Sequence, residues 1–324
     1  MKTLLASSLL ALMAATPALA NKAFVSNERG NTITVVDTET WEVLTEFDGG
    51  NRPRGITMSP DGTKLYVCAS DDNIVRVFDT ETYEELESLP SGPDPELFVL
   101  DPEGQYLYIA NEDDNLVTVT DTGTRTIKAE VPVGVEPEGM AISPDAKWVV
   151  NTSETTNMAH FISTEDYQIK HNVLVDQRPR YAQYTDDGTR LFVSSEIGGT
   201  VSVMDIAEDG TPSMVGKIAF EVPGVLPEWL QPVGIKITQD GSRIFVALGP
   251  ANRVAVIDGE SLEVIDYILV GQRVWQLAFT PGQDFLLTTN GNSNDITVID
   301  VAAEKAIKSV PVGQQPWGVV VTPN

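Results

Sequence analysis

The sequence is poor in the residues with which many enzymes and metalloproteins build their sites. Its 324 residues include one cysteine, Cys68, and two histidines, His160 and His171. A single cysteine excludes an intramolecular disulfide, and two histidines are too few for a histidine-rich zinc or copper centre. A Gly-x-Ser-x-Gly elbow, a phosphate-binding loop and a Cys-His arrangement are also absent. Motifs therefore assign no catalytic residue.

Basic residues are scarce as well. The chain has 21 Lys and Arg against 47 Asp and Glu, which gives a formal net charge of -26 at pH 7. Such an acidic surface repels polyanions, so neither nucleic acid nor an anionic membrane is an expected partner. Solubility explains the charge, and attraction to a basic partner protein is the alternative.

Only one long apolar run occurs, over residues 4–15 near the start of the chain. Lys2 precedes this run and Ala-Leu-Ala at 18–20 follows it, a pattern that predicts a cleaved signal peptide over residues 1–20. No later segment is long and apolar enough to span a bilayer. Export without disulfides favours a bacterial periplasm as the location of the mature chain.

The sequence has, in place of helical periodicity, a repeat of about 42 residues. An aspartate closes one alternating apolar run after another, at spacings of 42, 42, 84, 53 and 42 residues. These aspartates are Asp37, Asp79, Asp121, Asp205, Asp258 and Asp300. The doubled spacing skips residue 163, and the spacing of 53 indicates one longer repeat. A period of this length with several short strands per unit is typical of propeller blades.

Six complete repeats can be aligned, together with a partial repeat at each end. The complete repeats are 51–92, 93–134, 135–176, 177–230, 231–271 and 272–313. Residues 22–50 supply three strands and residues 314–324 supply the fourth strand of one further blade. The prediction is an all-β, seven-bladed β-propeller of four-stranded blades over residues 21–324, with its ring closed by the C-terminal strand. In the repeat over residues 51–92 the strands, named A to D from the axis outward, are expected at 55–58, 64–69, 73–78 and 84–89.

The start of strand A lies nearest the axis, so superposing the repeats shows which residues surround the mouth of the central channel. The first ring is Arg52, Asp94, Glu136, Arg178, Gln231, Arg273 and Gln315. The second ring, two residues later, is Arg54, Glu96, Glu138, Arg180, Val233, Trp275 and Trp317. Positions two apart on an extended segment point to the same side. Five of the eleven arginines in the chain fall in these fourteen positions.

This enrichment predicts a site for a small, anionic and aromatic ligand, because arginine pairs with carboxylates and tryptophan stacks on planar rings. Trp229 lies in an insertion at 223–230 that is expected to cover the site in part. The predicted ligand-binding residues are Arg52, Arg54, Arg178, Arg180, Arg273, Trp275, Trp317 and Trp229. The alternative is that the acidic residues of blades 3 and 4 neutralise the arginines and that no ligand binds.

Acidic residues form a second pattern, in the loops between strands B and C. One repeat position carries Glu28, Glu112, Glu154 and Glu196, and these loops are expected to share a face with the two rings. Carboxylates from several loops could hold Ca²⁺ or another hard cation. Because no Asp-x-Asp-x-Asp loop is present, a solvated acidic face is the alternative.

The repeat carries recognisable motifs. Ser-Pro-Asp-Gly at 59–62 is followed by Leu-Tyr-Val at 65–67, and Val-x-Val-x-Asp and Asp-Thr-Glu-Thr segments also occur. With these motifs the chain resembles the YVTN-type seven-bladed propeller family over residues 22–324, and that resemblance implies the propeller fold.

A closer likeness is to exported propellers associated with PQQ-dependent alcohol catabolism. It rests on the signal peptide, on Lys-Ala-Phe-Val-Ser-Asn-Glu at 22–28, and on the Pro-Gly-Val…Pro-Glu…Gln-Pro-Val-Gly-Ile segment at 223–235. That resemblance implies a periplasmic accessory role in quinoprotein oxidation.

The expected function is therefore that of an accessory binding protein, rather than an enzyme, for PQQ-dependent alcohol oxidation. It would bind a PQQ-like anion at the channel mouth, or a quinoprotein dehydrogenase, a cytochrome or an ABC transporter component. Two alternatives stay open. One is an interaction scaffold without a small-molecule ligand, and the other is a metal-dependent, lactonase-like hydrolase, suggested by fold analogy alone.

Overall fold

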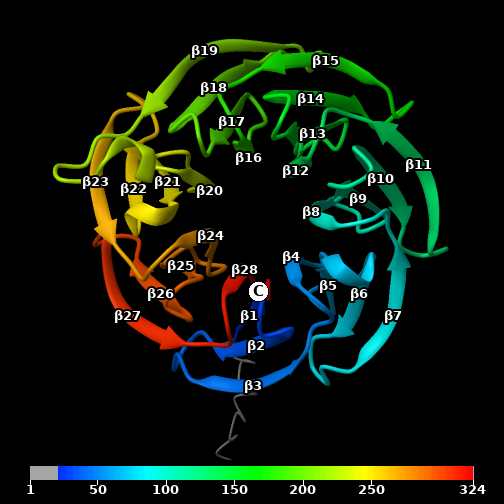
Figure 1. The fold of residues 1–324 in the computed structure, drawn as a ribbon, viewed down its shortest axis with the longest axis horizontal. Helices are drawn as coiled ribbons and strands as arrows, with labels where there is room; N and C mark the ends of the chain where they lie inside the picture. Colours follow the sequence, from blue (N-terminus) through cyan, green and yellow to red (C-terminus); the bar gives the residue numbers. More distant parts are fainter. Residues whose placement is uncertain (1–20, 324) are drawn as a thin grey trace, which may run out of the picture.

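The computed structural model describes residues 21–323, and the predicted signal peptide lies outside them. Seven four-stranded antiparallel sheets surround a central axis, which confirms the predicted all-β, seven-bladed propeller (Figure 1). The described helical segments are the three short 3₁₀ turns η1 (Ser70–Asp72), η2 (Pro227–Trp229) and η3 (Gly249–Ala251). No helix among the described residues is long and apolar enough to cross a membrane.

The blades are numbered in chain order, each from its innermost strand outward. Blade 1 is β28 (Pro316–Val321), β1 (Lys22–Asn27), β2 (Thr32–Asp37) and β3 (Val43–Asp48). Blade 2 is β4 (Pro53–Met58), β5 (Lys64–Ala69), β6 (Ile74–Asp79) and β7 (Glu85–Pro90). Blade 3 is β8 (Pro95–Leu100), β9 (Tyr106–Asn111), β10 (Leu116–Asp121) and β11 (Thr126–Pro132). Blade 4 is β12 (Pro137–Ile142), β13 (Trp148–Ser153), β14 (Met158–Ser163) and β15 (Ile169–Leu174).

The remaining blades follow the same order. Blade 5 is β16 (Pro179–Tyr184), β17 (Arg190–Ser195), β18 (Thr200–Ile206) and β19 (Pro212–Ala219). Blade 6 is β20 (Pro232–Ile237), β21 (Arg243–Leu248), β22 (Arg253–Asp258) and β23 (Val264–Leu269). Blade 7 is β24 (Val274–Phe279), β25 (Phe285–Asn290), β26 (Asp295–Asp300) and β27 (Lys305–Pro311).

The ring is closed by pairing the two ends of the chain. Strand β28 pairs antiparallel with β1, with Ala23 opposite Val321 and Val25 opposite Val319. This pairing leaves no open blade at the point where the chain begins and ends, so the edge that would invite aggregation is covered.

The core lies between neighbouring blades. Phe24, Ile33 and Val35 of blade 1 pack against Leu65 and Val67 of blade 2 in one cluster, and similar clusters follow around the ring. The B and C strands are buried on both faces, which explains their β-branched and aromatic composition, whereas the D strands are largely exposed. Each blade is therefore stabilised mainly by its two neighbours.

The aspartate that closes most of the C strands is part of a turn, whereas blade 4 has Ser163 there and Asp205 of blade 5 contacts Arg190 instead. The Oδ1 atom of Asp37 accepts hydrogen bonds from the backbone N–H groups of Glu39 and Thr40, each at 2.8 Å. Asp79 and Asp121 make the same contacts. The repeated aspartate therefore fixes the C–D turn, as side chains of this type commonly do.

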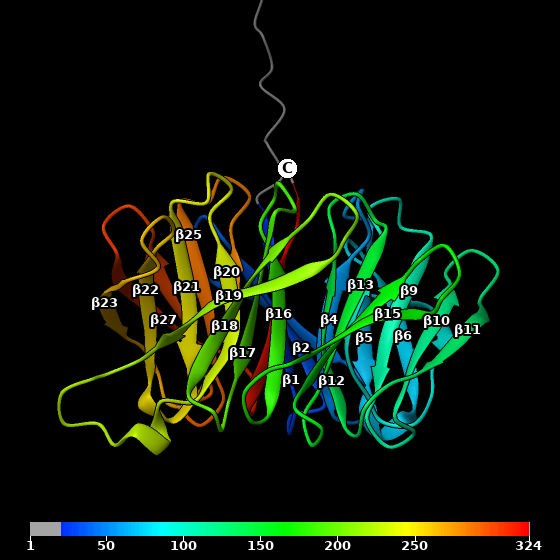
Figure 2. The same ribbon diagram turned by 90° about the horizontal axis from the view of Figure 1, so that it is seen from above.

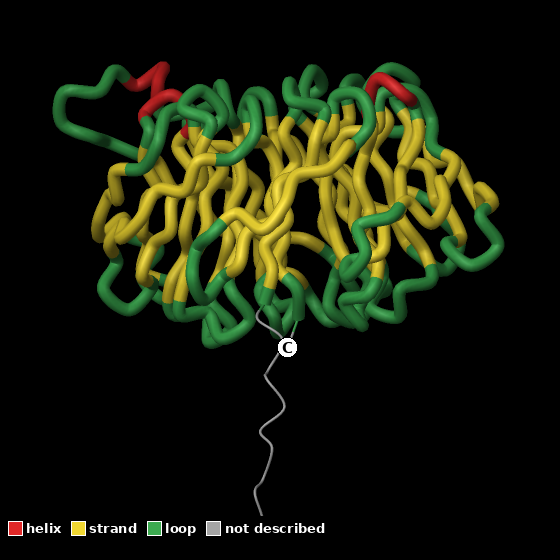
Figure 3. The backbone as a smooth tube through the Cα atoms, turned by 90° about the horizontal axis from the view of Figure 1, so that it is seen from below, coloured by secondary structure: helices red, strands yellow, loops and turns green. Residues whose placement is uncertain are grey.

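The two faces of the disc differ. The three 3₁₀ turns and the insertion between β19 and β20 lie on one face, which we call the mouth face (Figure 3). The insertion extends well beyond the rim of the disc (Figure 2, lower left). The described chain ends lie on the opposite face, so the channel mouth is formed only by the D–A and B–C connections.

Candidate functional site

The first ring residues have an unusual backbone conformation. Arg52, Asp94, Glu136, Arg178, Arg273 and Gln315 all have a positive φ, between 48° and 58°. For residues other than glycine this left-handed conformation costs free energy, and it persists because each backbone N–H is held. In Arg52 the N–H donates to Asn31 Oδ1 at 3.0 Å, and in Arg273 it donates to Asn252 Oδ1 at 2.8 Å.

The asparagines that hold the ring form a set of their own. Each lies 21 residues before the ring residue it binds, in the B–C connection of the preceding blade. They are Asn31, Asn73, Asn115, Asn157, Asn252 and Asn294. Sequence reasoning missed these residues, although their recurrence with the period of the blade was a visible signal.

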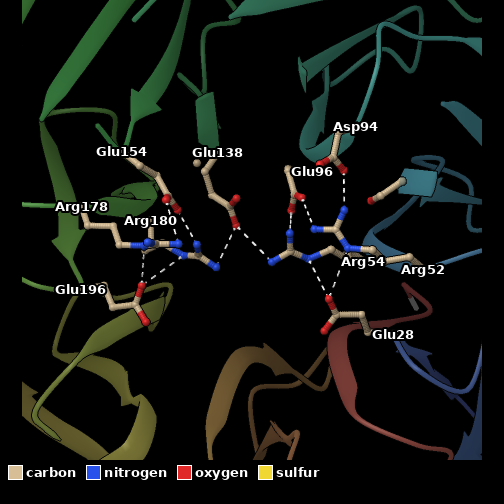
Figure 4. A network of polar contacts seen from close by, with 12 residues as sticks. Glu28, Arg52, Arg54, Asp94, Glu96, Glu138, Glu154, Arg178, Arg180 and Glu196 are labelled. Carbon is tan, nitrogen blue, oxygen red and sulfur yellow. Dashed lines mark hydrogen bonds and ion pairs between the residues drawn. The ribbon is translucent and has the colours of Figure 1, made fainter. Parts of the chain in front are cut away.

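Arg52 and Arg54 form one side of an ion-pair network at the mouth (Figure 4). Arg52 Nη1 lies 2.7 Å from Asp94 Oδ1, and Arg52 Nη2 lies 3.0 Å from Glu96 Oε1. Arg54 also contacts Glu96, and Glu28 approaches both guanidinium groups at 3.5 Å and 3.7 Å. Glu96 is fully buried between the two arginines, so they satisfy a charge that would otherwise be costly.

Arg178 and Arg180 form the other side of the network. Arg178 lies 3.0 Å from a carboxylate oxygen of Glu154 and 3.0 Å from one of Glu196. Arg180, which is 4% exposed, contacts Glu154 and lies 3.2 Å from Glu138 Oε1. The same oxygen of Glu138 lies 3.9 Å from Arg54, so Glu138 joins the two sides across the channel (Figure 4).

The predicted neutralisation of arginine by acidic side chains is therefore present, but it is not balanced. Arg273 adds a fifth guanidinium, which lies 2.7 Å from Glu196 Oε1. The carboxyl groups at the mouth outnumber these five guanidinium groups. The less exposed ones are Glu28, Asp94, Glu96, Glu112, Glu138, Glu154 and Glu196, and the exposed Asp71 also approaches Arg52. A surplus of buried acid in a confined space favours protonation of some members.

Glu112 is the clearest case. No ion pair joins Glu112 to any described arginine, and its carboxyl oxygen lies within 4.8 Å of those of Asp94 and Glu96. Burial, together with repulsion from Glu96 and Glu138, raises the pKa of Glu112 to about 8. Burial likewise raises the pKa of Glu154 to about 7 and outweighs the effect of Arg180. Burial opposes ionisation of Glu196 too, but Arg180 and Arg273 lower its pKa below the ordinary value.

A cavity of about 390 Å³ lies above this network, and we call it the mouth cavity. Its lining is Arg52, Arg54, Glu112, Arg178, Arg180, Glu196, Ile197, Arg273 and Trp275. Arg178 and Arg52 keep 45% and 29% of their side chains exposed, so part of each side chain is open to a ligand. Glu112 faces the same space as a carboxyl group that is neutral below about pH 8.

Trp275 and Arg273 lie together on one wall, with the guanidinium carbon 4.0 Å from the centre of the indole ring. Two glycines of the B–C connections make room for them. A Cβ at Gly291 would lie 2.6 Å from Trp275 Nε1, and a Cβ at Gly249 would lie 3.1 Å from Arg273 Nη1. In the blades that carry glutamate at this repeat position, a carboxylate occupies the corresponding space.

A second cavity of about 500 Å³, the side cavity, adjoins the first through Arg273 and Trp275. Trp229 of the insertion lines it together with Asn252, Gln272 and Gln315. Trp229 is 54% exposed, so its ring is available to a ligand. The insertion therefore reaches the side cavity through Trp229, whereas none of its residues lines the mouth cavity.

The structure does not bring the other predicted site residues to an open binding site. Trp317 is fully buried beneath Arg54, whose guanidinium carbon lies 4.7 Å from the ring, so it offers no open face at the mouth. The four glutamates of the predicted cation site are not gathered around one point, because Glu28, Glu154 and Glu196 pair with arginines. The carboxylates that do converge are Asp94, Glu96 and Glu112. Arg52 and Arg54 already contact two of these three, so the set does not fit a resident Ca²⁺.

Comparison with known proteins gives a family. The model of the family described as "Lactonase, 7-bladed beta-propeller" matches residues 19–130 and 168–310. No relative among curated proteins matches the chain.

Solved structures share the fold at low sequence identity. The periplasmic gluconolactonase of Pseudomonas aeruginosa is 17% identical, with a TM-score of 0.78 over 93% of this chain and 99% of that one. A candidate 6-phosphogluconolactonase of Bacteroides fragilis is 18% identical, with a TM-score of 0.80 over 94% and 99%. The hydrazine synthase of Kuenenia stuttgartiensis is 22% identical, with a TM-score of 0.77 over 86% and 92%.

Proposed function

This chain belongs to the seven-bladed lactonase propeller family, and from that premise we propose that it hydrolyses a lactone of a sugar acid in the mouth cavity. The proposal rests on the position of Glu112 in the lining of a cavity rich in arginine. The pKa of its carboxyl group is raised to about 8. An acid–base group with a pKa near the working pH is what the opening of an ester ring requires. Of the functions that the sequence left open, the comparisons favour the lactonase-like hydrolase, which the sequence suggested as metal-dependent and which we propose here with Glu112 as the acid–base group.

The chemistry assigned to Glu112 is proton transfer in both directions. In its ionised form it accepts a proton from the water that attacks the lactone carbonyl carbon. The carbonyl electron pair moves onto oxygen, and this oxyanion is stabilised by a guanidinium of the lining, for which Arg178 has the most exposed surface. When the intermediate collapses, the ring C–O bond breaks and Glu112 returns the proton to the leaving oxygen. The products are a hydroxyl group and a carboxylic acid, and the acid ionises in water.

The shape and charge of the cavities favour a substrate with an acidic substituent. Arg52 and Arg273 line the mouth cavity with part of their guanidinium surface exposed, and such groups bind phosphate or carboxylate. Trp275 and Trp229 line the adjoining side cavity, where an indole face can pack against the apolar face of a sugar ring. We therefore propose a phosphorylated or carboxylated sugar lactone as the substrate class.

The test is hydrolysis of a lactone panel, followed by acid release at constant pH. The panel contains δ-gluconolactone, 6-phosphogluconolactone and glucaro-1,4-lactone, with each spontaneous rate subtracted. For the wild type, kcat/KM is expected to rise with pH through about 8 and to be higher for the two lactones that carry an anionic group, phosphate or carboxylate. Glu112→Gln is expected to lower kcat by roughly 10²-fold or more and to abolish this pH dependence.

The matched control is Glu103→Gln, at an exposed glutamate of the same blade whose side chain forms no ion pair with any described residue. Its kcat and pH profile should equal those of the wild type. A wild-type protein that opens none of the three lactones faster than water contradicts the proposal. A Glu112→Gln variant with full activity contradicts the assigned role of Glu112.

Binding of a PQQ-like molecule is the second candidate function. The arginines around the mouth cavity and the face of Trp275 match a planar polycarboxylate, and the sequence likeness to propellers of PQQ-dependent alcohol catabolism supports it. Calorimetric titration of the same preparation with PQQ tests this candidate. Saturable binding that is weakened by Arg178→Gln supports it, and the absence of heat contradicts it.

We also propose that residues 1–20 direct export to a periplasm, where a quinoprotein dehydrogenase, a cytochrome or an ABC transporter component would be a partner under the second candidate function. Cell fractionation and the N-terminal sequence of the mature protein test export. Recovery of full-length chain from the cytoplasm alone contradicts it.

A further inference from the structure

A third cavity lies in the central channel on the side opposite the mouth. It has a volume of about 460 Å³, and we call it the channel cavity. Its lining comes from the innermost strands of all seven blades, at residues 56–57, 97–100, 140–142, 181–184, 236, 276–279 and 317–321. The channel cavity and the mouth cavity share no lining residue. Arg54, Glu138 and Arg180 cross the channel between them, so the two cavities are separate sites.

The charge of the channel cavity is opposite to that of the molecule. None of its lining residues is an aspartate or glutamate, and Lys236 is the only charged one. The Lys236 ammonium lies 3.3 Å from the hydroxyl of Tyr181 and 5.8 Å from the centre of its ring. No ion pair joins Lys236 to a carboxylate within residues 21–323. In a chain with a net charge of -26, a half-buried cation without a counter-ion marks a place for an anion.

Three buried residues of the same lining also have a polar atom without a hydrogen-bond partner. These atoms are Gln276 Nε2, Trp317 Nε1 and the hydroxyl of Tyr184. Buried polar groups are nearly always paired, so their clustering in one wall sets this part of the channel apart from the rest of the core. Lys236, Gln276 and Trp317 come from blades 6, 7 and 1, which are consecutive in the ring.

Most of the other lining residues are apolar, among them Phe98, Leu100, Met140, Phe279 and Val319. Thr57, Gln183 and Tyr184 add polar side-chain atoms to the wall. Its volume falls within the range of about 300–1,000 Å³ that is common for small-molecule sites. We propose that the channel cavity binds a small organic acid with one carboxylate and an apolar body. The carboxylate pairs with the ammonium group of Lys236, and the apolar body packs against the apolar part of the wall.

The test is calorimetric titration of the protein with octanoate, with 1-naphthoate as an aromatic probe and octanamide as a neutral one of matched shape. Binding of either carboxylate, with octanamide at least about tenfold weaker, is the expected result. Lys236→Met should weaken carboxylate binding by about tenfold or more. Lys128→Met, at an exposed position of β11 far from the channel, should leave binding unchanged.

Trp317 supplies a second readout, because a ligand beside its indole changes the fluorescence of the protein. That change should be lost in Trp317→Phe, whereas calorimetric binding persists. Octanamide binding as tightly as octanoate, unaltered affinity in a folded Lys236→Met variant, or no binding of either acid would overturn the proposal. Lys236 lies outside the mouth cavity, so lactone hydrolysis by Lys236→Met should equal that of the wild type. The two proposals can thus fail independently.

Discussion

The two halves of the channel mouth are built from the same repeat, and they differ in what the repeat carries. Blades 2 to 5 place arginines and acidic residues at both ring positions, and their B–C connections add Glu112, Glu154 and Glu196. We call this the charged half. Blades 6 and 7 carry Gly249 and Gly291 at the position of those glutamates, and they form the open half. Blade 1 carries Glu28 at this position, and Glu28 belongs to the charged network.

The difference shows how a symmetric scaffold acquires an asymmetric site. In the charged half, carboxylates and guanidiniums fill the space and hold one another, with Arg180 at the centre. In the open half, the missing side chains leave the side cavity, lined by Trp275 and Trp229. A ligand that bridges the two halves meets fixed charge at one end and a flat apolar surface at the other.

The largest expected effect comes from breaking the charged half at Arg180. Arg180→Met leaves Glu138 and Glu154 buried with fewer partners, and we expect a loss of about 3–5 kcal/mol in the free energy of unfolding at neutral pH. The loss should shrink in acid, where these carboxyl groups take up protons. Chemical denaturation measures both. The control is Arg190→Gln, which removes an exposed pair with Asp205 and should cost about 0–1 kcal/mol. Equal losses in the two variants would contradict a structural role for the network.

The second effect concerns the pH dependence of stability. The pKa of Glu112 is raised in the folded chain, so its contribution to stability is complete below its unfolded value and is lost as pH rises through about 8. Glu112→Gln cannot ionise. We expect the melting temperature of the wild type to fall more than that of Glu112→Gln between about pH 5 and pH 8.5. Parallel curves for the two proteins would show that Glu112 ionises freely, which would also remove the basis of its proposed catalytic role.

These two predictions rest on contacts that the sequence did not specify. Superposing the repeats placed the ring residues correctly around one mouth, because the turn contacts of Asp37 recur in most blades and keep the repeats in a common register. Superposition could not predict which arginine pairs with which carboxylate. Arg273 binds Glu196 from 77 positions away, and the choice among several nearby carboxylates depends on side-chain packing across the channel.

The fate of the tryptophans illustrates the same limit. Trp275 and Trp317 occupy one repeat position, and the sequence analysis predicted both as ligand-binding residues. Trp275 has Gly291 beside it and lines both adjoining cavities, whereas Trp317 lies under Arg54 and is closed off from the mouth. Strand A of blade 2 was also predicted two residues too short, because Pro53 already pairs with Ala69. The repeat period predicts where a residue lies in its blade, whereas the neighbouring side chains determine whether that residue is open to a ligand.

A third prediction tests the open half by filling it. Gly291→Ala places a methyl group 2.6 Å from Trp275 Nε1, so the indole must move. We expect a loss of about 1–3 kcal/mol in the free energy of unfolding, as is usual when a packed site is overfilled. KM for the sugar lactones should rise in the same variant. Gly216→Ala is the matched control, since a Cβ there meets no atom within 4 Å. If Gly291→Ala behaves like this control, the glycine does not shape the cavity.

The smallest expected effect on stability comes from Trp229 in the insertion, where we expect a change in KM without a change in kcat. Because its side chain is 54% exposed and contacts little of the core, Trp229→Ala should change the free energy of unfolding by no more than about 0.5 kcal/mol. Its ring lines the side cavity, so KM should rise by roughly threefold to tenfold while kcat, which depends on the charged half, stays constant. Leu226→Ala removes an equally exposed apolar side chain of the same insertion that does not line the cavity, and it should alter neither constant. A fall in kcat without a change in KM for Trp229→Ala would place the reacting bond in the open half. It would contradict the assignment of catalysis to the charged half and of substrate binding to the open half.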